Sequence, residues 1–187
     1  MRYDILYKLG EGNRGEVYKA VLENGQEVAI KWAKNYSIEK EWEILNYLNG
    51  YIAPKPIYKG NRYFIMELIK GKTLKDLDSF DYYTALRLSL IKAYELDEKN
   101  IYHSQLGRYY HIFLTQNNDI RFIDFERATF SKNARNFLQI VGYYLYRDKN
   151  FDKKYLDDIV KLYKINRLKA VENIIKEFDE SIYQKKN

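Results

Sequence analysis

Apolar and polar residues alternate along the first part of the chain with the two-residue period of a β-strand. The alternation covers residues 1–9 and 17–21 and resumes in Val28-Ala29-Ile30-Lys31. The second and third runs are separated by Glu23-Asn24-Gly25-Gln26, and Asn-Gly is a dipeptide favoured in tight hairpin turns. The pattern predicts three consecutive antiparallel strands, the last of which ends at a lysine.

The apolar period then changes to that of a helix. Residues 37–49 carry apolar side chains at helical spacing, which predicts one amphipathic helix. A second hairpin follows, with strands expected at residues 57–59 and 63–68. Residues 1–68 should therefore form a small antiparallel sheet with a single helix.

The rest of the chain is mostly helical in pattern. Residues 79–99 form a long amphipathic run, whose apolar stripe predicts a core helix. Two short strands, 112–115 and 120–123, follow it and lead directly to Asp124. Beyond them the helical period continues and predicts three helices, at residues 131–148, 152–165 and 167–184.

Length and composition suit one compact domain. The chain has 187 residues, of which 46% are apolar and 31% charged, and it has no cysteine, which excludes disulfides and thiolate metal sites. We expect an α+β fold in a single domain, 1–187, with a sheet-bearing N-lobe (1–68) and a mostly α-helical C-lobe (69–187). No apolar stretch approaches a membrane span and no signal pattern is evident, so we expect a cytoplasmic monomer.

The net charge of +6 is confined to the last third of the chain. Residues 1–126 hold 18 Lys and Arg against 18 Asp and Glu, whereas residues 127–187 hold 14 against 8. A one-sided positive surface attracts polyanions such as nucleic acid. A lysine-rich helical face in contact with solvent explains the same composition, so charge alone leaves both interpretations open.

Three glycines follow the first strand in the spacing Gly10-x-Gly12-x-x-Gly15. Glycines so spaced let the backbone lie close over a polyphosphate, where a Cβ would collide with the ligand or require a positive φ. A dinucleotide-binding turn has similar spacing but opens a helix. Here Val17 continues a strand, and strand, loop and strand lead on to Lys31, as in a phosphate-gripping hairpin. A glycine-rich hairpin without a ligand is the alternative.

Four motifs occur in one order along the chain. They are the glycine loop with Val17, the strand-ending Lys31, then His103 and Leu106 after the long helix, and Asp124-Phe125-Glu126. In this order the chain resembles the protein-kinase-like superfamily, and its small RIO-type branch most closely. The resemblance implies a minimal bilobal kinase fold that binds MgATP between its lobes, with the glycine loop over the phosphates.

The resemblance also implies roles for charged residues around ATP. Lys31 would hold the α- and β-phosphates, and Glu41 in the following helix would orient Lys31. Glu39 and Glu43 are neighbours that could be mistaken for Glu41, and all three could be surface carboxylates. Asp124 would carry Mg²⁺, because it occupies the position of the metal-binding aspartate.

Residues 66–69 resemble the hinge between the lobes of a kinase. If so, Met66 lies behind the base pocket, and the Glu67 carbonyl and the Ile69 amide bond adenine. A buried strand leaving a sheet would explain Met66 equally well. The implied ATP-binding set is completed by Gly10, Gly12, Asn13, Gly15, Val17 and Lys31.

The catalytic loop departs from the kinase pattern. Gln105 stands where an aspartate should receive the substrate proton, and Tyr110 stands where an asparagine should bind a second Mg²⁺. A neutral amide is no general base near pH 7, so the chain is either an enzyme with rearranged parts or a catalytically inactive nucleotide-binding adaptor. Phosphoryl transfer relies mostly on positioning and charge neutralisation, so the loss of the base is survivable.

Other side chains in this loop could compensate. Arg108 could neutralise the transferring phosphate, and His111 could be a metal or phosphate ligand, so the expected metal ligands are Asp124 and His111. His103 is more simply structural, because the matching kinase histidine mainly packs and bonds backbone. Glu126, in place of the usual glycine, adds a carboxylate beside Asp124.

Two stretches narrow the resemblance. Residues 105–112, Gln-Leu-Gly-Arg-Tyr-Tyr-His-Ile, and residues 123–128, Ile-Asp-Phe-Glu-Arg-Ala, look like one archaeal group within the superfamily. That group includes an RNA kinase that phosphorylates the ribose 2′-hydroxyl of an internal tRNA uridine, position 47 in tRNA numbering. The resemblance implies a tRNA substrate whose hydroxyl is aligned by Gln105, Arg108 and His111. A RIO-type protein serine/threonine kinase remains the alternative.

Two further features favour RNA. Few residues separate Glu126 from the next predicted helix and no Ala-Pro-Glu follows, so the activation segment and peptide-docking region of protein kinases are expected to be missing. Positive charge collects beyond this point, and RNA is held by Lys and Arg and by stacking of bases on aromatic rings. The candidates are Lys132, Arg135, Arg147, Lys149, Lys153 and Lys154, with Tyr143, Tyr144 and Tyr146, although helix packing explains most of these tyrosines more simply.

Overall fold

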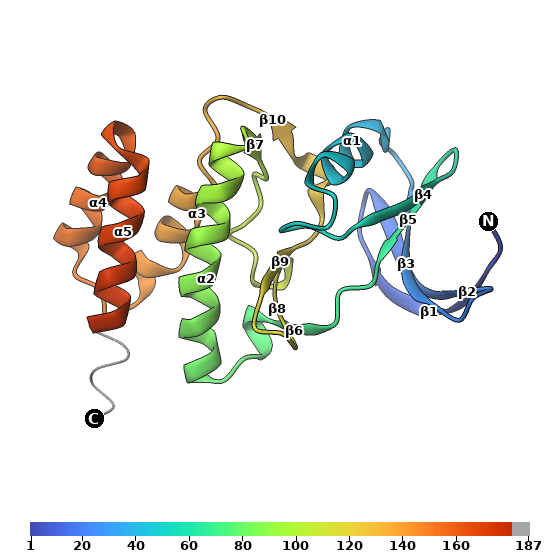
Figure 1. Ribbon diagram of the computed structural model, residues 1–187, viewed down its shortest axis with the longest axis horizontal. Helices are drawn as coiled ribbons and strands as arrows, with labels where there is room; N and C mark the ends of the chain where they lie inside the picture. The colour runs from blue at the N-terminus through green and yellow to red at the C-terminus, as the bar shows by residue number, and fades with distance from the viewer. Residues whose placement is uncertain (181–187) are drawn as a thin grey trace.

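In the computed structural model, which describes residues 1–180, the N-terminal part is a five-stranded antiparallel sheet with the order β1-β2-β3-β5-β4 (Figure 1). Both predicted hairpins are confirmed, and Gly25 in the first of them takes a φ of 81°. That value is accessible to glycine without steric cost. The strands are β1 (Tyr3–Glu11), β2 (Gly15–Leu22), β3 (Glu27–Ala33), β4 (Pro56–Lys59) and β5 (Tyr63–Glu67).

The predicted N-terminal helix is also confirmed, as α1 (Glu39–Leu48), and it ends at Asn49 in a left-handed conformation. Its buried face carries Ile44 and Leu45. These side chains join Phe64 of the sheet to the hydrophobic cluster of the C-terminal part. Packing of α1 between the sheet and the rest of the chain therefore fixes how the two parts meet.

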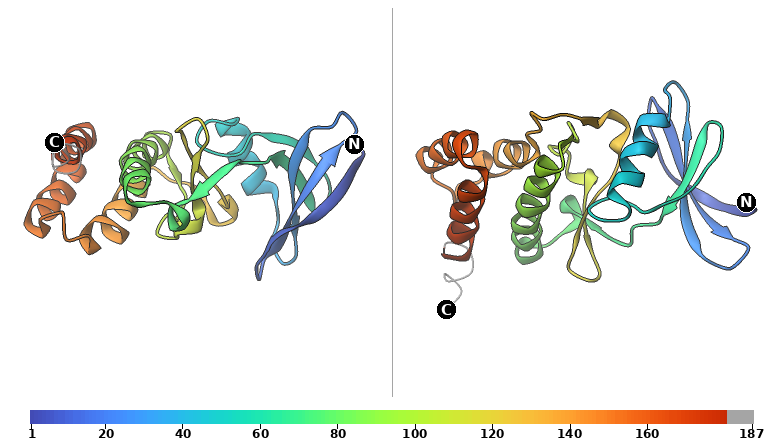
Figure 2. Two further views of the ribbon diagram at one scale, coloured as in Figure 1. Left: turned by 90° about the horizontal axis from the view of Figure 1, so that it is seen from below. Right: turned by 45° about the horizontal axis from the view of Figure 1, so that its top comes forward.

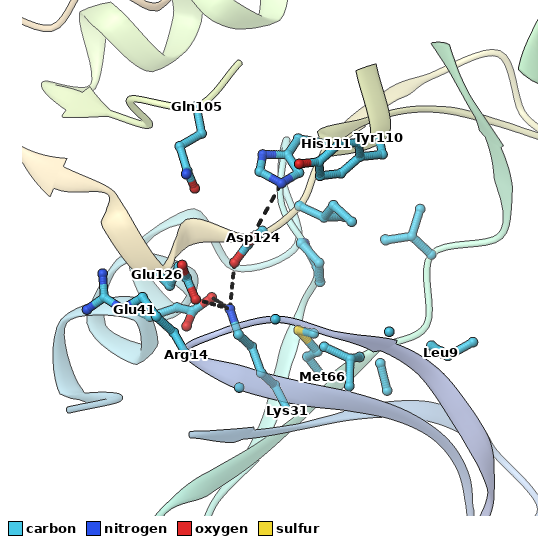
Figure 3. Close-up of a pocket in the computed structure, with 18 of the residues that line it drawn as sticks. Leu9, Arg14, Lys31, Glu41, Met66, Gln105, Tyr110, His111, Asp124 and Glu126 are labelled. Carbon is cyan, nitrogen blue, oxygen red and sulfur yellow. Dashed lines mark hydrogen bonds and ion pairs between the residues drawn. The ribbon is translucent and has the colours of Figure 1, made fainter. Parts of the chain in front are cut away.

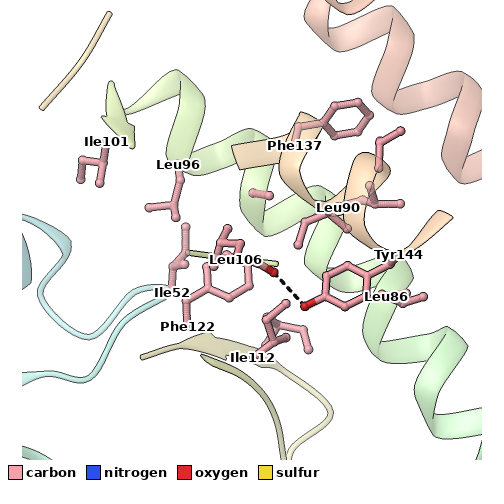
Figure 4. Close-up of a cluster of buried hydrophobic side chains, with 14 of the residues drawn as sticks. Ile52, Leu86, Leu90, Leu96, Ile101, Leu106, Ile112, Phe122, Phe137 and Tyr144 are labelled. Atoms are coloured by element: carbon pink, nitrogen blue, oxygen red, sulfur yellow. Dashed lines mark hydrogen bonds between the residues drawn. The ribbon is translucent and has the colours of Figure 1, made fainter. Parts of the chain in front are cut away.

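The C-terminal part is built around α2 (Ser79–Glu98). Its buried residues Leu86, Leu90 and Leu96 pack in one cluster with Phe137 of α3 and with Tyr144, which follows α3 (Figure 4). The other elements are β6 (Gly71–Thr73), β7 (Ile101–Tyr102), β8 (Ile112–Thr115), β9 (Ile120–Phe122), β10 (Thr129–Phe130), α3 (Asn136–Tyr143), α4 (Lys153–Ile165) and α5 (Arg167–Phe178), with four short 3₁₀ turns.

The molecule is elongated, with the N-terminal sheet at one end and α4 and α5 at the other (Figures 1 and 2). The small sheets β6-β8-β9 and β10-β7 lie in between. The architecture is α+β, an antiparallel sheet followed by helices, and it is compatible with a small kinase-like bilobal fold. Within residues 1–180, no helix combines the length and the apolar character needed to cross a membrane.

The helix predicted at residues 131–148 is wrong in its first part. Residues 129–130 form β10 and pair with β7, the Ser131 N–H donates to the Asn100 carbonyl at 2.6 Å, and α3 begins only at Asn136. A 3₁₀ turn, Leu145–Arg147, follows it. The helix predicted at 167–184 ends at Phe178, and residues 181–184 lie outside the described residues.

Asp97, a fully buried carboxylate at the end of α2, explains where α3 begins. Its Oδ1 accepts hydrogen bonds from the Asn136 backbone N–H at 2.7 Å and from the Asn136 side-chain amide at 2.8 Å. Its Oδ2 accepts hydrogen bonds from the Phe137 backbone N–H at 3.1 Å and from the Tyr163 hydroxyl at 2.6 Å. An anion at a helix N-terminus is favourable, because the first N–H groups lack partners within the helix. Asp97 thus joins α2, α3 and α4.

Candidate functional site

A cleft of about 640 Å³ lies between the N-terminal sheet and the C-terminal part. Its walls include every residue predicted from the sequence to bind nucleotide or take part in catalysis. One end is apolar, with Leu9 and Met66, and the other carries the charged side chains of Lys31, Asp124 and Glu126 (Figure 3). The cleft therefore separates an apolar compartment from an ionic one.

Lys31, on β3, is the buried cation of the ionic end, with only 4% of its surface exposed. Its ammonium lies 2.9 Å from Glu41 Oε1, 2.7 Å from Asp124 Oδ1 and 3.8 Å from Glu126 Oε2. Burial alone would lower its pKa, but Glu41 and Asp124 outweigh that effect and raise it. Lys31 is therefore charged, and it faces three carboxylates.

Glu41 is the carboxylate of α1 that reaches Lys31. The neighbouring Glu39 is exposed and pairs with Lys59 instead, and Glu43 does not line the cleft. The second oxygen of Glu41 accepts from the Tyr36 hydroxyl at 2.6 Å. Both oxygens are thus held, and Glu41 cannot rotate away from Lys31 without losing a buried hydrogen bond.

Replacing Tyr36 by phenylalanine should loosen Glu41 while keeping the ring that packs beside it. A hydrogen bond to a charged group is worth about 1.5–3 kcal/mol, so the free energy of unfolding should fall by about that amount and ATP-dependent turnover should fall with it. Urea denaturation and steady-state kinetics measure the two effects. Tyr58→Phe, on the edge strand β4, is the matched control and should change neither.

Asp124 lies across the cleft from the glycine loop and takes a left-handed conformation, with φ 66° and ψ 65°. A non-glycine residue in this region is strained and persists only where the surroundings hold it. Here Oδ1 bonds Lys31 and Oδ2 lies 3.4 Å from His111 Nε2. Burial would raise the pKa of Asp124, but Lys31 and His111 lower it overall, so Asp124 is a carboxylate anion aimed into the cleft.

Glu126 is the second carboxylate beside Asp124. Burial and the charge of Asp124 raise its pKa, against the influence of Lys31. The Arg14 side chain extends from the glycine loop toward it (Figure 3). The glycine of the usual kinase motif is thus replaced by a side chain that takes part in the ionic end of the cleft.

The catalytic loop places two unsatisfied polar atoms at the cleft. Gln105 is 8% exposed and its Oε1 has no hydrogen-bond partner, and His111 is 2% exposed with an unpartnered Nδ1. Burial lowers the pKa of His111, with Asp124 acting in the opposite direction. Buried polar atoms rarely stay without a partner, so Gln105 Oε1 and His111 Nδ1 are available to a polar group that enters the cleft.

His103 is structural. Its Nδ1 faces the Gln105 N–H at 3.3 Å and its Nε2 lies 2.9 Å from the Ile123 carbonyl. Since the backbone N–H at Nδ1 can only donate, Nε2 must carry the proton of the neutral ring. The His103 backbone N–H donates in turn to Asn136 Oδ1 at 2.8 Å, which ties the catalytic loop to α3.

Acid should destabilise the protein through His103. Burial lowers its pKa from the ordinary 6.5 to about 3, so between these values the unfolded chain binds a proton that the folded protein does not. This contribution to stability is complete above pH 6.5 and falls as the pH decreases toward 3, by up to ~1.4 kcal/mol per pH unit. Urea unfolding at several pH values measures the slope. In His103→Gln the slope should be flatter, and an unchanged slope would contradict the assignment.

The glycine loop does not need the positive φ angles that its glycines would permit. None of Gly10, Gly12 and Gly15 has a positive φ, so backbone strain is not the reason for glycine. A Cβ at Gly15 would lie 2.5 Å from the Trp32 carbonyl oxygen, whereas Cβ atoms at Gly10 and Gly12 would meet nothing within 4 Å. Gly15 is required by the sheet itself, and Gly10 and Gly12 leave open space above the cleft.

The remaining predicted binding residues also lie around the cleft. Asn13 and Val17 line it from the glycine hairpin, and Met66, Glu67 and Ile69 line it where the chain leaves β5. Glu67 also accepts from the Lys55 N–H through its side chain at 3.1 Å. The adenine-bonding roles of Glu67 and Ile69 stay predictions.

These residues fit MgATP. Leu9, Val17 and Met66 offer an apolar slot for a base, and the open space at Gly10 and Gly12 leaves room for phosphates near the Lys31 ammonium. Asp124 and Glu126 offer the carboxylate oxygens that Mg²⁺ prefers. Within residues 1–180, no group of three or more His, Asp or Glu side chains could hold a metal by itself. A metal that takes the rest of its ligands from phosphate and water suits such a site.

The fold and the cleft together are compatible with a small bilobal protein of the kinase-like class. Among curated proteins, the chain is similar to the RIO-type serine/threonine-protein kinase Rio2 of Methanocaldococcus jannaschii, with 26% identity over 159 residues. The match covers 65% of this chain and 57% of that protein, so the chain spans little more than half of its relative. No protein-family model matches the chain. The similarity supports the protein-kinase-like superfamily, RIO type, with the general use of ATP and Mg²⁺.

Sequence reasoning missed some contributors and left others undecided. Tyr36 carries no motif signal, because its role comes from where the chain crosses between β3 and α1. Arg14 was not predicted, because it occupies a variable position between the glycines of the loop. Among the tyrosines suggested for stacking, Tyr144 is buried and its hydroxyl donates to the Leu106 carbonyl at 2.8 Å, so it cannot receive a base.

Proposed function

We propose that the protein is an ATP-dependent RNA kinase that transfers the γ-phosphate to a ribose 2′-hydroxyl of an internal tRNA uridine, position 47 by family resemblance. The observation that carries the proposal is the short chain segment between the cleft and α3. Residues 127–135 pass from the cleft to α3 through one short strand, β10, pinned to β7. No peptide-docking subdomain intervenes in this segment. This short segment favours a large folded substrate over a peptide held by a docking subdomain.

The catalytic loop suits an alcohol acceptor. Bound MgATP supplies the phosphoryl group and the metal charge. The acceptor oxygen bonds to phosphorus as the bond to the β,γ-bridging oxygen breaks, and the hydroxyl proton and ADP leave. Lys31, held by Glu41, orients the phosphates, and Gln105 Oε1 can accept a hydrogen bond from the hydroxyl. Arg108, exposed at the cleft, can offset charge as the phosphate transfers.

A RIO-type protein serine/threonine kinase is the second candidate, because the curated relative carries that description. In that case the hydroxyl would come from a serine or threonine of a partner or of this chain. Gln105 stands in place of the catalytic aspartate, so the protein could also bind nucleotide without transferring phosphate. The assay below includes this outcome, an inactive nucleotide-binding adaptor.

One assay separates these functions. The protein is incubated with γ-labelled ATP, Mg²⁺, bulk tRNA and a protein mixture, and the labelled species are isolated. Label at an internal ribose of tRNA supports the proposal, label on protein supports the second candidate, and no label in either identifies an adaptor. Mapping the labelled nucleotide then tests position 47. Binding of tRNA should also weaken steeply with salt, because bound phosphates release counterions.

A further inference from the structure

An exposed aromatic ring lies directly beside the catalytic loop. Tyr143, at the end of α3, is 47% exposed, although it is preceded by a largely buried helix. A Cβ at Gly107 would lie 2.5–2.6 Å from the Tyr143 ring atoms Cγ, Cδ2 and Cε2. The ring can therefore rest against the loop only because residue 107 is glycine. This contact fixes the ring and covers part of one face, and the ring stays about half exposed.

Two arginines lie over exposed tyrosine rings of this surface. The Arg147 guanidinium lies over the Tyr143 ring, 5.7 Å from its centroid, and the Arg108 guanidinium lies 6.0 Å from the centroid of Tyr110. Tyr110 is 52% exposed. Within residues 1–180, neither arginine forms an ion pair with a carboxylate, and the nearby acid Asp148 is engaged by Tyr83 and Asn150. The surface thus combines two arginines that pair with no carboxylate and two tyrosine rings that are each about half exposed.

This surface is continuous with the cleft. Arg108 and Tyr110 line the cleft, Gly107 adjoins Arg108 in the chain, and Tyr143 rests on Gly107. We call the surface made by Gly107, Arg108, Tyr110, Tyr143 and Arg147 the aromatic shelf. Exposed rings with unpaired arginines match an unpaired nucleobase and its phosphates, because bases stack on rings and arginine pairs with phosphate. An acidic peptide would match the charge but would leave the rings without a partner.

We propose that the aromatic shelf binds a single-stranded nucleotide next to the acceptor, with its base on Tyr143 and its phosphates at Arg147 and Arg108. The inference rests on the proposed RNA kinase function and adds a base-holding site to it. The shelf would admit an unpaired loop of RNA and exclude a duplex, whose bases are stacked on each other.

Binding of RNA without ATP tests the shelf separately from catalysis. The probe is a fluorescein-labelled single-stranded oligouridylate, measured by anisotropy at several salt concentrations. Tyr143→Leu should weaken binding about fivefold or more, since stacking of one base on one ring is worth at least that much, whereas Tyr143→Phe should bind within about twofold of the unchanged protein. Arg147→Ala should weaken binding and lower the slope of log affinity against log salt by about one.

The matched control is Tyr47→Leu, which removes a tyrosine of similar exposure, 57%, from α1. It should leave binding unchanged. Affinity retained in Tyr143→Leu, or lost equally in Tyr143→Phe, would overturn the shelf. Equal binding of duplex RNA or of polyglutamate would overturn it as well, since neither presents an unpaired base.

The same variants separate this inference from the kinase proposal. If the unchanged protein labels tRNA and Tyr143→Leu keeps the same KM for tRNA, the shelf is wrong and the kinase proposal stands. If no RNA is labelled but oligouridylate binding still depends on Tyr143, the kinase proposal fails and the shelf stands.

Discussion

Replacement of Asp124 by alanine is expected to lower the rate of phosphoryl transfer more than about a thousandfold and to leave the affinity for tRNA unchanged. The Asp124 carboxylate is the anion that lies within 2.7 Å of the Lys31 ammonium and faces the cleft. Without it the site loses the ligand expected to hold Mg²⁺, and metal charge is worth several kcal/mol in the transition state. Labelling of tRNA with γ-labelled ATP and a separate filter-binding assay measure the two effects.

The controls follow from the geometry of the site. Asp124→Asn keeps the shape of the side chain and should be nearly as inactive, because the negative charge is what binds metal. Asp4→Ala removes an exposed carboxylate from β1 and should leave both assays unchanged. Labelling of tRNA at the normal rate by Asp124→Ala would show that the site is wrongly assigned.

Replacement of Asp97 by alanine is expected to cause the largest loss of stability, about 3–5 kcal/mol. The change leaves two backbone N–H groups at the start of α3, the Asn136 side chain and the Tyr163 hydroxyl without their buried acceptor. Each buried donor left unpaired costs about 1–3 kcal/mol, with partial recovery by rearrangement and water. Chemical denaturation monitored by circular dichroism measures the loss.

Activity should decline with it, because Asn136 also holds the His103 backbone N–H of the catalytic loop. Asp158→Ala is the matched control. Asp158 lies on α4, its side chain is 65% exposed, and among residues 1–180 its ion pair is with Lys161 at the surface. Its loss should therefore change stability by less than ~0.5 kcal/mol. If Asp97→Ala changed the free energy of unfolding by a similarly small amount, Asp97 would not be the residue that joins α2, α3 and α4.

Local patterns were sufficient to predict the N-terminal sheet, α1 and α2. The turn at Gly25 and the strand alternation act within a few residues, so the sequence contains the whole signal. The beginning of α3 could not be predicted in this way. It depends on Asp97, which lies 39 residues earlier than Asn136 in the chain, and on the pairing of β10 with β7. Long-range contacts of this kind override the helical period of residues 131–135.

The site shows the same division. Lys31, Glu41 and Asp124 were found because they stand in motifs with a fixed order, and the structure brings them together. Tyr36 was not found, because a single tyrosine between a strand and a helix has no pattern. Tyr144 was left open between packing and stacking, because composition cannot tell a ring that packs in the core from Tyr143, which stays in contact with solvent. The catalytic and metal-binding roles stay predictions.

The three acids around Lys31 have a consequence for how the cleft selects its ligand. The Lys31 ammonium lies within 4 Å of Glu41, Asp124 and Glu126, and Arg127 Nε lies 3.8 Å from Glu126 Oε1. The carboxylates of these ion pairs therefore outnumber the cations by one whenever all three acids are ionised. A bare triphosphate would be repelled from the ionic end, since like charges brought together in a partly buried site are costly. We therefore expect the cleft to bind the magnesium complex of the nucleotide and to reject the free nucleotide. Divalent ions would then be needed for the nucleotide to bind at all, and not only for its phosphate to be transferred.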